Sequence, residues 1–465
     1  MAWRAARARC CVMHDRAPIL ALATPPGRGA LAVVRLAGVG AFDLAAQLCQ
    51  PWPLSPRRAT LAALRAVDGR LIDRALVVAM PGPASFTGDD TVEFTVHGGP
   101  AVVAALLEAG LALGAREARA GEFTRRAVLS GRLDLAQAEA IGSLVDANSE
   151  AMRAAAVEQL DGGLSRRVHR LRDALVDLEA LLAYDIDFPE EDDGPIAPAR
   201  IAGVADDVHR ALAQLLATAP AGEALREGAN VVLAGAPNVG KSSLFNALLG
   251  RARALVTPEP GTTRDAIEAV LETPRWPVRL VDTAGLRETS EPVERLGIEV
   301  SVEAVRRAAV VLACGDTAQA LAETLGRLQA LATVAPIIAV LTKRDLHRAS
   351  GVPELSGAVV VVPVSAESGE GLSALVAAVL DQLDVRYGRA HVDQPRLLRE
   401  RQVRAVRTAH EELGEFLRGW RDGVTPVVIS ATHVRGAIDA LEAVVGVVSV
   451  DEVLDRLFAT FCVGK

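Results

Sequence analysis

Lysine is almost absent from this 465-residue sequence. Only Lys241, Lys343 and Lys465 stand among its 50 lysines and arginines. Because arginine is preferred nearly everywhere, each remaining lysine is expected where a compact ammonium is needed rather than a planar guanidinium. Two of the three lie inside the motifs described below, and the third should occupy a confined site.

Aromatic residues are also scarce, at 3% of the sequence, and the formal net charge is −8. Few aromatics argue against a platform that stacks bases, and the excess of acids argues against a surface that coats any polyanion. Any nucleic acid must therefore be bound by a local basic patch, and a DNA partner is not expected.

Cysteine is rare too, and the five cysteines form neither a CxxC metal spacing nor a dense disulfide framework. They are Cys10, Cys11, Cys49, Cys314 and Cys462. A reducing cytoplasm is the simplest interpretation. No uncharged apolar run approaches the roughly 18 residues of a membrane span, so no membrane partner is expected. Residues 1–12 are rich in arginine and lack acids, and we interpret Met13 as the better natural start.

The chain is long enough for about three domains, and half of its residues are apolar. Short β-rich runs with one helix predict a small α/β domain at 18–134, and helical spacing follows, interrupted by an acidic loop from Asp185 to Asp193. That loop is interpreted as a solvated helix end, not a metal site. Apolar strands then alternate with helices, which predicts a parallel sheet covered on both faces. We expect this α/β module, 225–383, to be inserted into one helical domain formed by 135–224 and 384–465.

A glycine-rich loop, Gly235–Ser242, follows an apolar strand and precedes a helix, which is the context of a P-loop. Its backbone N–H groups would surround phosphates, while Lys241 places a point charge on the β/γ oxygens and Ser242 offers a hydroxyl to Mg²⁺.

Two further segments complete this pattern. Asp282–Gly285 ends an apolar strand, where Asp282 can hold Mg²⁺ through water and Gly285 can sense the γ-phosphate. Gly261–Asp265 lies between the two motifs, and there Thr263 would supply a second hydroxyl to the metal.

The segments that follow two later apolar strands are expected to bind the guanine base. Asp345, in Thr342–Asp345, would accept two N–H bonds from guanine while the stem of Lys343 packs on the ring, which selects GTP over ATP. Thr342 replaces the usual asparagine of this motif. Ser365 and Ala366 would complete the pocket through backbone contacts.

Leu286 stands where signalling GTPases place a water-orienting glutamine. Here the chain resembles the MnmE (TrmE) family of tRNA-modification GTPases from Ile19 to Lys465. The resemblance is carried by Thr24–Gly29, Ser85–Gly88, His97–Pro100, Gly121–Thr124, Leu133–Ala140 and Phe461–Lys465.

The resemblance implies that K⁺ replaces an arginine finger, with Asn238, Thr257, Glu259 and Thr262 as its ligands, and that Glu294 positions the attacking water. A cation beside the β–γ bridge would stabilise developing charge in a closed site. The implied nucleotide-binding residues are Asn238, Val239, Gly240, Lys241, Ser242, Ser243, Thr257, Pro258, Glu259, Pro260, Gly261, Thr262, Thr263, Asp282, Thr283, Ala284, Gly285, Thr342, Lys343, Arg344, Asp345, Ser365 and Ala366.

It also implies that the amino-terminal domain dimerises and binds a reduced folate, 5,10-methylene- or 5-formyl-tetrahydrofolate, through Arg35, Glu93, Arg132 and Lys465. Arg132 stands where the family commonly has lysine, and Cys462 is a candidate thiol by resemblance alone. With the FAD-dependent partner MnmG, in a heterotetramer, such a protein adds an aminomethyl or carboxymethylaminomethyl group to carbon 5 of the wobble uridine of certain tRNAs. GTP hydrolysis would open and close the G-domains.

Two alternatives stay open. One is an assembly or translation GTPase that binds ribosomes without modification activity, against which the folate-domain motifs argue. The other is a scaffold that delivers tRNA without essential turnover, which a hydrolysis-dead Glu294 variant would test.

Overall fold

The computed structural model describes residues 16–187, 197–251, 254–255, 267–282, 302–346, 355–388, 395–423, 426–446 and 464. The chain divides into two compact units, the first formed by Met1–Glu139 with Gly446–Lys465 and the second by Ala140–Val445. The bounds of the four segments expected from the sequence stay predictions. In the described part of the chain, no helix has both the length and the apolar character needed to cross a bilayer.

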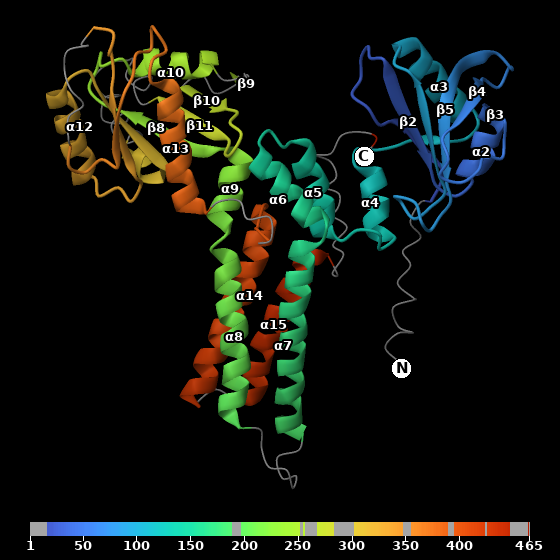
Figure 1. Ribbon diagram of the computed structural model, residues 1–465. Coiled ribbons are helices and arrows are strands. Elements are labelled where there is room, and N and C mark those ends of the chain that lie inside the picture. The colour runs from blue at the N-terminus through green and yellow to red at the C-terminus, as the bar shows by residue number, and fades with distance from the viewer. Residues whose placement is uncertain are drawn as a thin grey trace, which may run out of the picture. The chain divides into compact units, whose positions relative to one another are not determined.

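The first unit is built on a seven-stranded sheet. Its strands are β1 (Ile19–Leu22), β2 (Leu31–Ala37), β3 (Cys49–Gln50), β4 (Thr60–Arg65), β5 (Leu71–Met80), β6 (Thr91–His97) and β7 (Arg116–Glu117). The order across the sheet is β3-β4-β5-β6-β2-β1-β7, antiparallel except where β1 pairs with β7. The predicted strands are confirmed, and this unit occupies the blue and cyan part of Figure 1.

Helices α2 (Ala41–Leu48) and α3 (Pro100–Ala112) contribute to the core of this unit, which includes Leu36, Phe94 and Leu106. Alternating residues of β6 are buried, as expected of a strand with one face on a core. Proline at the start of α3 costs no helical hydrogen bond, because the N–H groups of the first turn have no acceptor within the helix. Helix α4 (Glu122–Leu129) and the start of α5 (Leu135–Val145) follow. The expectation of a single helix at 18–134 is therefore wrong, because α2 and α4 lie there beside α3.

The second unit contains a helical region. Its helices are α6 (Glu150–Leu160), α7 (Gly163–Asp187), α8 (Pro198–Leu216), α9 (Ala219–Glu227), α14 (Glu400–Asp422) and α15 (Val427–Val445). Figure 1 shows α7, α8, α14 and α15 side by side. Helix α7 buries leucine and valine at spacings of three and four residues, as the sequence predicts. The expected acidic loop starts too early, because α7 continues to Asp187 and passes the predicted start at Asp185.

A second seven-stranded sheet lies in the same unit. Its strands are β8 (Ala229–Ala234), β9 (Ala254–Leu255), β10 (Ile267–Leu271), β11 (Val278–Asp282), β12 (Val310–Gly315), β13 (Ile337–Leu341) and β14 (Val360–Pro363), with helices α10 (Lys241–Arg251), α12 (Ala318–Ala330) and α13 (Leu372–Tyr387). The order is β14-β13-β12-β8-β11-β10-β9. The predicted parallel sheet is confirmed from β14 to β11, whereas β10 and β9 add an antiparallel edge.

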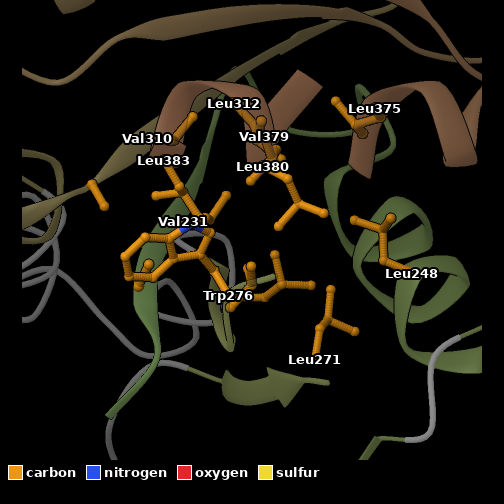
Figure 2. Packing of buried hydrophobic residues seen from close by; sticks show 14 of the residues in the cluster. Val231, Leu248, Leu271, Trp276, Val310, Leu312, Leu375, Val379, Leu380 and Leu383 are labelled. Carbon is orange, nitrogen blue, oxygen red and sulfur yellow. The ribbon is translucent and has the colours of Figure 1, made fainter. Parts of the chain in front are cut away.

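Trp276 fills the core on one side of this sheet and is 1% exposed. Figure 2 shows its ring among apolar side chains from β8, β12 and α13. Its indole N–H donates to Asp384 of α13 at 2.9 Å, and the neighbouring Arg275 pairs with Asp381 and Asp384. The turn between β10 and β11 is therefore fastened to α13 by packing and by charge.

Candidate functional site

The sequence motifs of the second unit converge at the carboxyl ends of its parallel strands. Strand β8 leads into the glycine loop, β11 ends at Asp282, β12 leads to Asp316 and β13 to Thr342. The carboxyl edge of an open parallel sheet is where such folds bind ligands, because the loops that follow neighbouring strands meet there.

The backbone of the glycine loop adopts positive φ angles that few residue types tolerate. Gly235 has a φ of 156°, and a Cβ there would lie 2.4 Å from the carbonyl oxygen of Cys314. Asn238 has a φ of 64°, in the left-handed region that asparagine tolerates better than most residues. Lys241 is 5% exposed, and its ammonium donates to the carbonyls of Gly235 at 2.9 Å and Ala236 at 2.8 Å.

Ser242, in the first turn of α10, donates its hydroxyl hydrogen to Oδ2 of Asp282 at 2.9 Å. Asp282 is 1% exposed at the end of β11, and Ser242 is exposed. A hydroxyl and a carboxylate are hard oxygen donors of the kind that Mg²⁺ prefers. The donor chemistry of these two side chains therefore fits the predicted magnesium site.

Thr342 and Lys343 tie the base motif to the glycine loop. The hydroxyl of Thr342, which is 3% exposed, donates to the carbonyl of Val239 at 2.5 Å. The ammonium of Lys343 donates to the carbonyl of Asn238 at 2.8 Å and pairs with Asp316 at 3.0 Å. The threonine hydroxyl thus links the loop after β13 to the glycine loop by a hydrogen bond.

Asp316 is a site residue that the sequence interpretation missed. It follows Gly315, the last residue of β12, at the same sheet edge as the other motifs. Its position in the sequence, directly after a buried strand of the parallel core, could have identified this carboxylate as a candidate.

The remaining base-pocket residues lie on two adjoining loops. The N–H of Arg344 donates to the carbonyl of Val364 at 3.1 Å, which joins the loop after β13 to the loop after β14. Ser365 is fully buried, and its hydroxyl accepts from the N–H of Ser368 at 3.1 Å. Asp345 is partly exposed in the turn that follows Lys343, and Ala366 is also partly exposed.

Cys49 and Cys314 are buried free thiols. Burial raises the pKa of Cys49 to about 11 and the pKa of Cys314 to about 12. Both thiols therefore stay protonated at neutral pH, and neither is a nucleophile. Among the residues that the structure describes, no group of three or more His, Cys, Asp or Glu side chains is arranged to hold a metal.

A second cluster of predicted residues lies in the first unit. Arg35 of β2 and Glu93 of β6 are register partners, and Nε of Arg35 donates to Oε1 of Glu93 at 2.9 Å. Nη1 of Arg35 also donates to the carbonyl of Gly464 at 3.4 Å, so one residue of the terminal motif lies against β2. Arg132 is exposed on the loop after α4, and its N–H donates to the carbonyl of Ala127 at 2.8 Å.

Several predicted site residues fall outside the described residues. They are Thr257, Pro258, Glu259, Pro260, Gly261, Thr262, Thr263, Thr283, Ala284, Gly285, Glu294, Cys462 and Lys465. Their roles stay predictions.

Comparison with known proteins decides the family. The family model described as GTP-binding protein TrmE N-terminus matches residues 18–132, and the one described as MnmE helical domain matches residues 135–462. This chain belongs to the MnmE (TrmE) family. The predicted resemblance is therefore confirmed, together with the predicted multidomain fold class of α/β and helical parts.

Curated relatives in the MnmE family match over their whole length. The tRNA modification GTPase MnmE of Neisseria meningitidis serogroup B is 42% identical over 455 residues, which are 97% of this chain and 100% of that protein. The tRNA modification GTPase MnmE of Azoarcus sp. is 42% identical over 460 residues, with the same shares. Among solved structures, the G domain of the T. maritima FeoB iron transporter is 26% identical and covers 33% of this chain and 98% of its own, with a TM-score of 0.27.

Proposed function

We propose that this chain is the GTP hydrolase of its family and acts in tRNA modification. Relatives named tRNA modification GTPase match it over their whole length. One observation in the structure carries the hydrolase assignment: the Ser242 hydroxyl and the Asp282 carboxylate meet at the end of the glycine loop, 2.9 Å apart. The chain belongs to a family of enzymes, and the Glu294 variant distinguishes this function from that of a scaffold that delivers tRNA without essential turnover.

Magnesium would be held by Ser242 and Thr263 directly and by Asp282 through water, and it would neutralise charge on the β- and γ-phosphates. Lys241 adds a fixed positive charge, because two loop carbonyls orient its ammonium. Asp345 would accept hydrogen bonds from the guanine edge. These residues bind and orient GTP, with the Lys343 stem against the base.

Potassium would supply the positive charge that an arginine finger gives other GTPases. Asn238 is exposed on the glycine loop and carries an amide oxygen that suits a monovalent cation. Thr257, Glu259 and Thr262 are the other proposed ligands of this K⁺ ion. Glu294 would orient the attacking water in place of the glutamine that Leu286 replaces.

A reduced folate is the proposed one-carbon donor, bound by Arg35, Glu93, Arg132 and Lys465. Arginine guanidinium and lysine ammonium suit the glutamate carboxylates of a folate, and Glu93 suits the N–H edge of its pterin. Support comes from the hydrogen bond between Arg35 and the carbonyl of Gly464, the residue before Lys465, and from the pairing of Arg35 with Glu93.

The proposed assembly is a cytoplasmic homodimer that joins the FAD-dependent partner MnmG in a heterotetramer and modifies carbon 5 of the wobble uridine. Hydrolysis would drive opening and closing of the G-domains rather than the carbon chemistry.

Nucleoside analysis of tRNA tests this function most directly. Cells that lack the gene should lose the modified wobble uridine, and the wild-type gene or a D207N variant should restore it, because the Asp207 side chain on α8 is exposed. The D282N variant should not. Normal modification in the deletion strain would reject the proposal, and altered ribosome assembly in that strain would favour the assembly GTPase.

Removing residues 462–465 separates the two activities. This truncation should weaken binding of 5-formyl-tetrahydrofolate and abolish modification while GTP hydrolysis stays near wild type. Equal folate affinity in truncated and full-length protein would show that the tail lies outside the folate site.

A further inference from the structure

The guanidinium of Arg35 lies over two phenylalanine rings. Its Cζ is 5.5 Å from the centroid of Phe86 and 5.4 Å from the centroid of Phe123. Phe86 belongs to the segment between β5 and β6, and Phe123 belongs to the first turn of α4. A cation within about 6 Å of an aromatic centroid is attracted to the face of the ring. Two separate segments of the fold therefore hold one side chain.

Polar contacts fix the same guanidinium in a second way. Nε donates to Oε1 of Glu93 at 2.9 Å, Nη2 lies 2.7 Å from that oxygen, and Nη1 donates to Gly464 at 3.4 Å. The side chain of Arg35 is 20% exposed. A guanidinium has five N–H donors, so further Nη hydrogens have no partner among the described residues. These contacts hold the charged head in place.

The two rings are packed to different degrees. Phe123 is fully buried in a cluster with Ile19, Ala21 and Ala37, and Phe86 is partly buried against that cluster. A change in the orientation of Phe123 would therefore cost packing energy, and Phe86 packs against the cluster that contains it. Both rings come from sequence motifs, Ser85–Gly88 and Gly121–Thr124, that the proposed mechanism leaves without a role.

We propose that Phe86 and Phe123 are positioning residues that orient Arg35 toward a carboxylate-bearing ligand. The inference rests on the proposed folate site and assigns it two residues that do not themselves bind the ligand. Arginine loses much rotamer freedom when it binds, and a guanidinium that already contacts two rings and pairs with a carboxylate loses less. The aromatic pair thus contributes to affinity through preorganisation.

The test uses full-length protein and 5-formyl-tetrahydrofolate as the probe. F86L keeps a bulky apolar side chain but removes the ring, and it should weaken folate binding roughly two- to fivefold. F86Y keeps the ring and should bind like wild type. F42L is the matched control, because Phe42 is a partly buried phenylalanine of the same unit that packs edge-on against Trp52. GTP hydrolysis should be unchanged in all three.

Equal affinity of F86L and wild type would overturn the inference, as would an equal loss in F86Y and F86L. A second measurement needs no folate. In ¹⁵N spectra, assigned with an R35K variant, the Nε–H signal of Arg35 should shift in F86L because the ring current of Phe86 is lost, and it should stay in F42L. An unmoved signal would overturn the inference, whereas a shifted signal with no folate binding by the wild type would reject the folate site alone.

Discussion

Lys343 donates a hydrogen bond from its ammonium to the carbonyl of Asn238, 2.8 Å away, and so joins the loop that reads the base to the loop that surrounds the phosphates. Lys343 and Asn238 both have positive φ, 55° and 64°. This conformation costs an L-residue backbone energy, which the surrounding contacts must offset. Asp316 holds the same ammonium from the other side at 3.0 Å. In a chain with three lysines, this one occupies a site where a compact cation bridges a carbonyl and a carboxylate.

GTP turnover should depend on K⁺ and fall sharply when Na⁺ replaces it, because Leu286 cannot orient water. N238A should lose most of the stimulation while it still binds GTP, since Lys343 contacts the backbone and not the side chain of Asn238. N246A, an exposed asparagine on α10, is the control. Equal steady-state rates in the two salts would exclude the proposed K⁺ site.

Glu294→Ala should lower the hydrolysis rate with little change in nucleotide affinity, because the carboxylate is proposed to act only on the attacking water. Single-turnover rates and nucleotide titrations separate the two effects. Glu291→Ala, three residues earlier, should leave both unchanged. A matched loss of affinity in E294A would mark a structural residue instead.

Asp345→Asn should shift preference from guanine toward xanthine nucleotides, because the new amide donates where the carboxylate accepted. Competition between GTP and XTP measures the shift. D316N is an informative companion, since it weakens the hold on Lys343 without exchanging the group proposed to read the base. Unchanged base preference in D345N would place the pocket elsewhere.

Asp384→Ala should destabilise the second unit by about 1–3 kcal/mol, since the indole N–H of the buried Trp276 loses its acceptor. Urea unfolding measures this loss. Asp381→Ala removes a carboxylate that is 64% exposed and pairs with the same Arg275, so it should cost less than about 1 kcal/mol. Equal losses in the two variants would show that the indole bond contributes nothing.

Low pH should lower the free energy of unfolding of the first unit, because Glu122 becomes protonated. Burial alone would raise the pKa of this carboxyl, but hydrogen bonds from Arg116 and the Arg119 N–H, together with the charges of Arg116 and Arg126, lower it to about 2. Because the folded-state pKa is depressed, the stabilisation is present above the ordinary value of about 4.3 and is lost as pH falls toward 2. It amounts to about 3 kcal/mol.

Urea unfolding of E122Q and wild type at pH 5 and pH 3 checks this prediction. The variant should be less stable at pH 5, and its disadvantage should shrink at pH 3. E117Q, at an exposed neighbouring position, should follow the wild type at both values. A constant difference between E122Q and wild type would rule out titration of Glu122 as the cause.

The sequence predicts the parallel core of the second unit well, because β8, β12 and β13 are short apolar runs buried on both faces. It also predicts the glycine loop, since glycine at Gly235 and Gly240 answers a local backbone requirement. The antiparallel edge escapes it, because β10 and β9 are short and their pairing depends on partners elsewhere in the sheet.

Long-range side-chain contacts are what the sequence does not reveal. Trp276 and Asp384 are 108 residues apart, and nothing in either neighbourhood encodes the hydrogen bond between them. The contacts of the two phenylalanines with Arg35 were missed for the same reason: the three residues lie on separate segments, which only the folded topology brings near. Asp316 is different, because its position directly after a buried strand was a signal in the sequence.

The bond from Arg35 to Gly464 joins residues 429 positions apart. During synthesis from the amino terminus, the strand that carries Arg35 emerges early, and the carbonyl that it binds emerges only after the whole second unit. Contacts of such high sequence separation form late, because the intervening chain must first exist and then collapse. A ribosome that stops after residue 366 but before 464 releases a product with every described element of the nucleotide site and without this carbonyl. Translation therefore completes the nucleotide site before the Arg35 cluster.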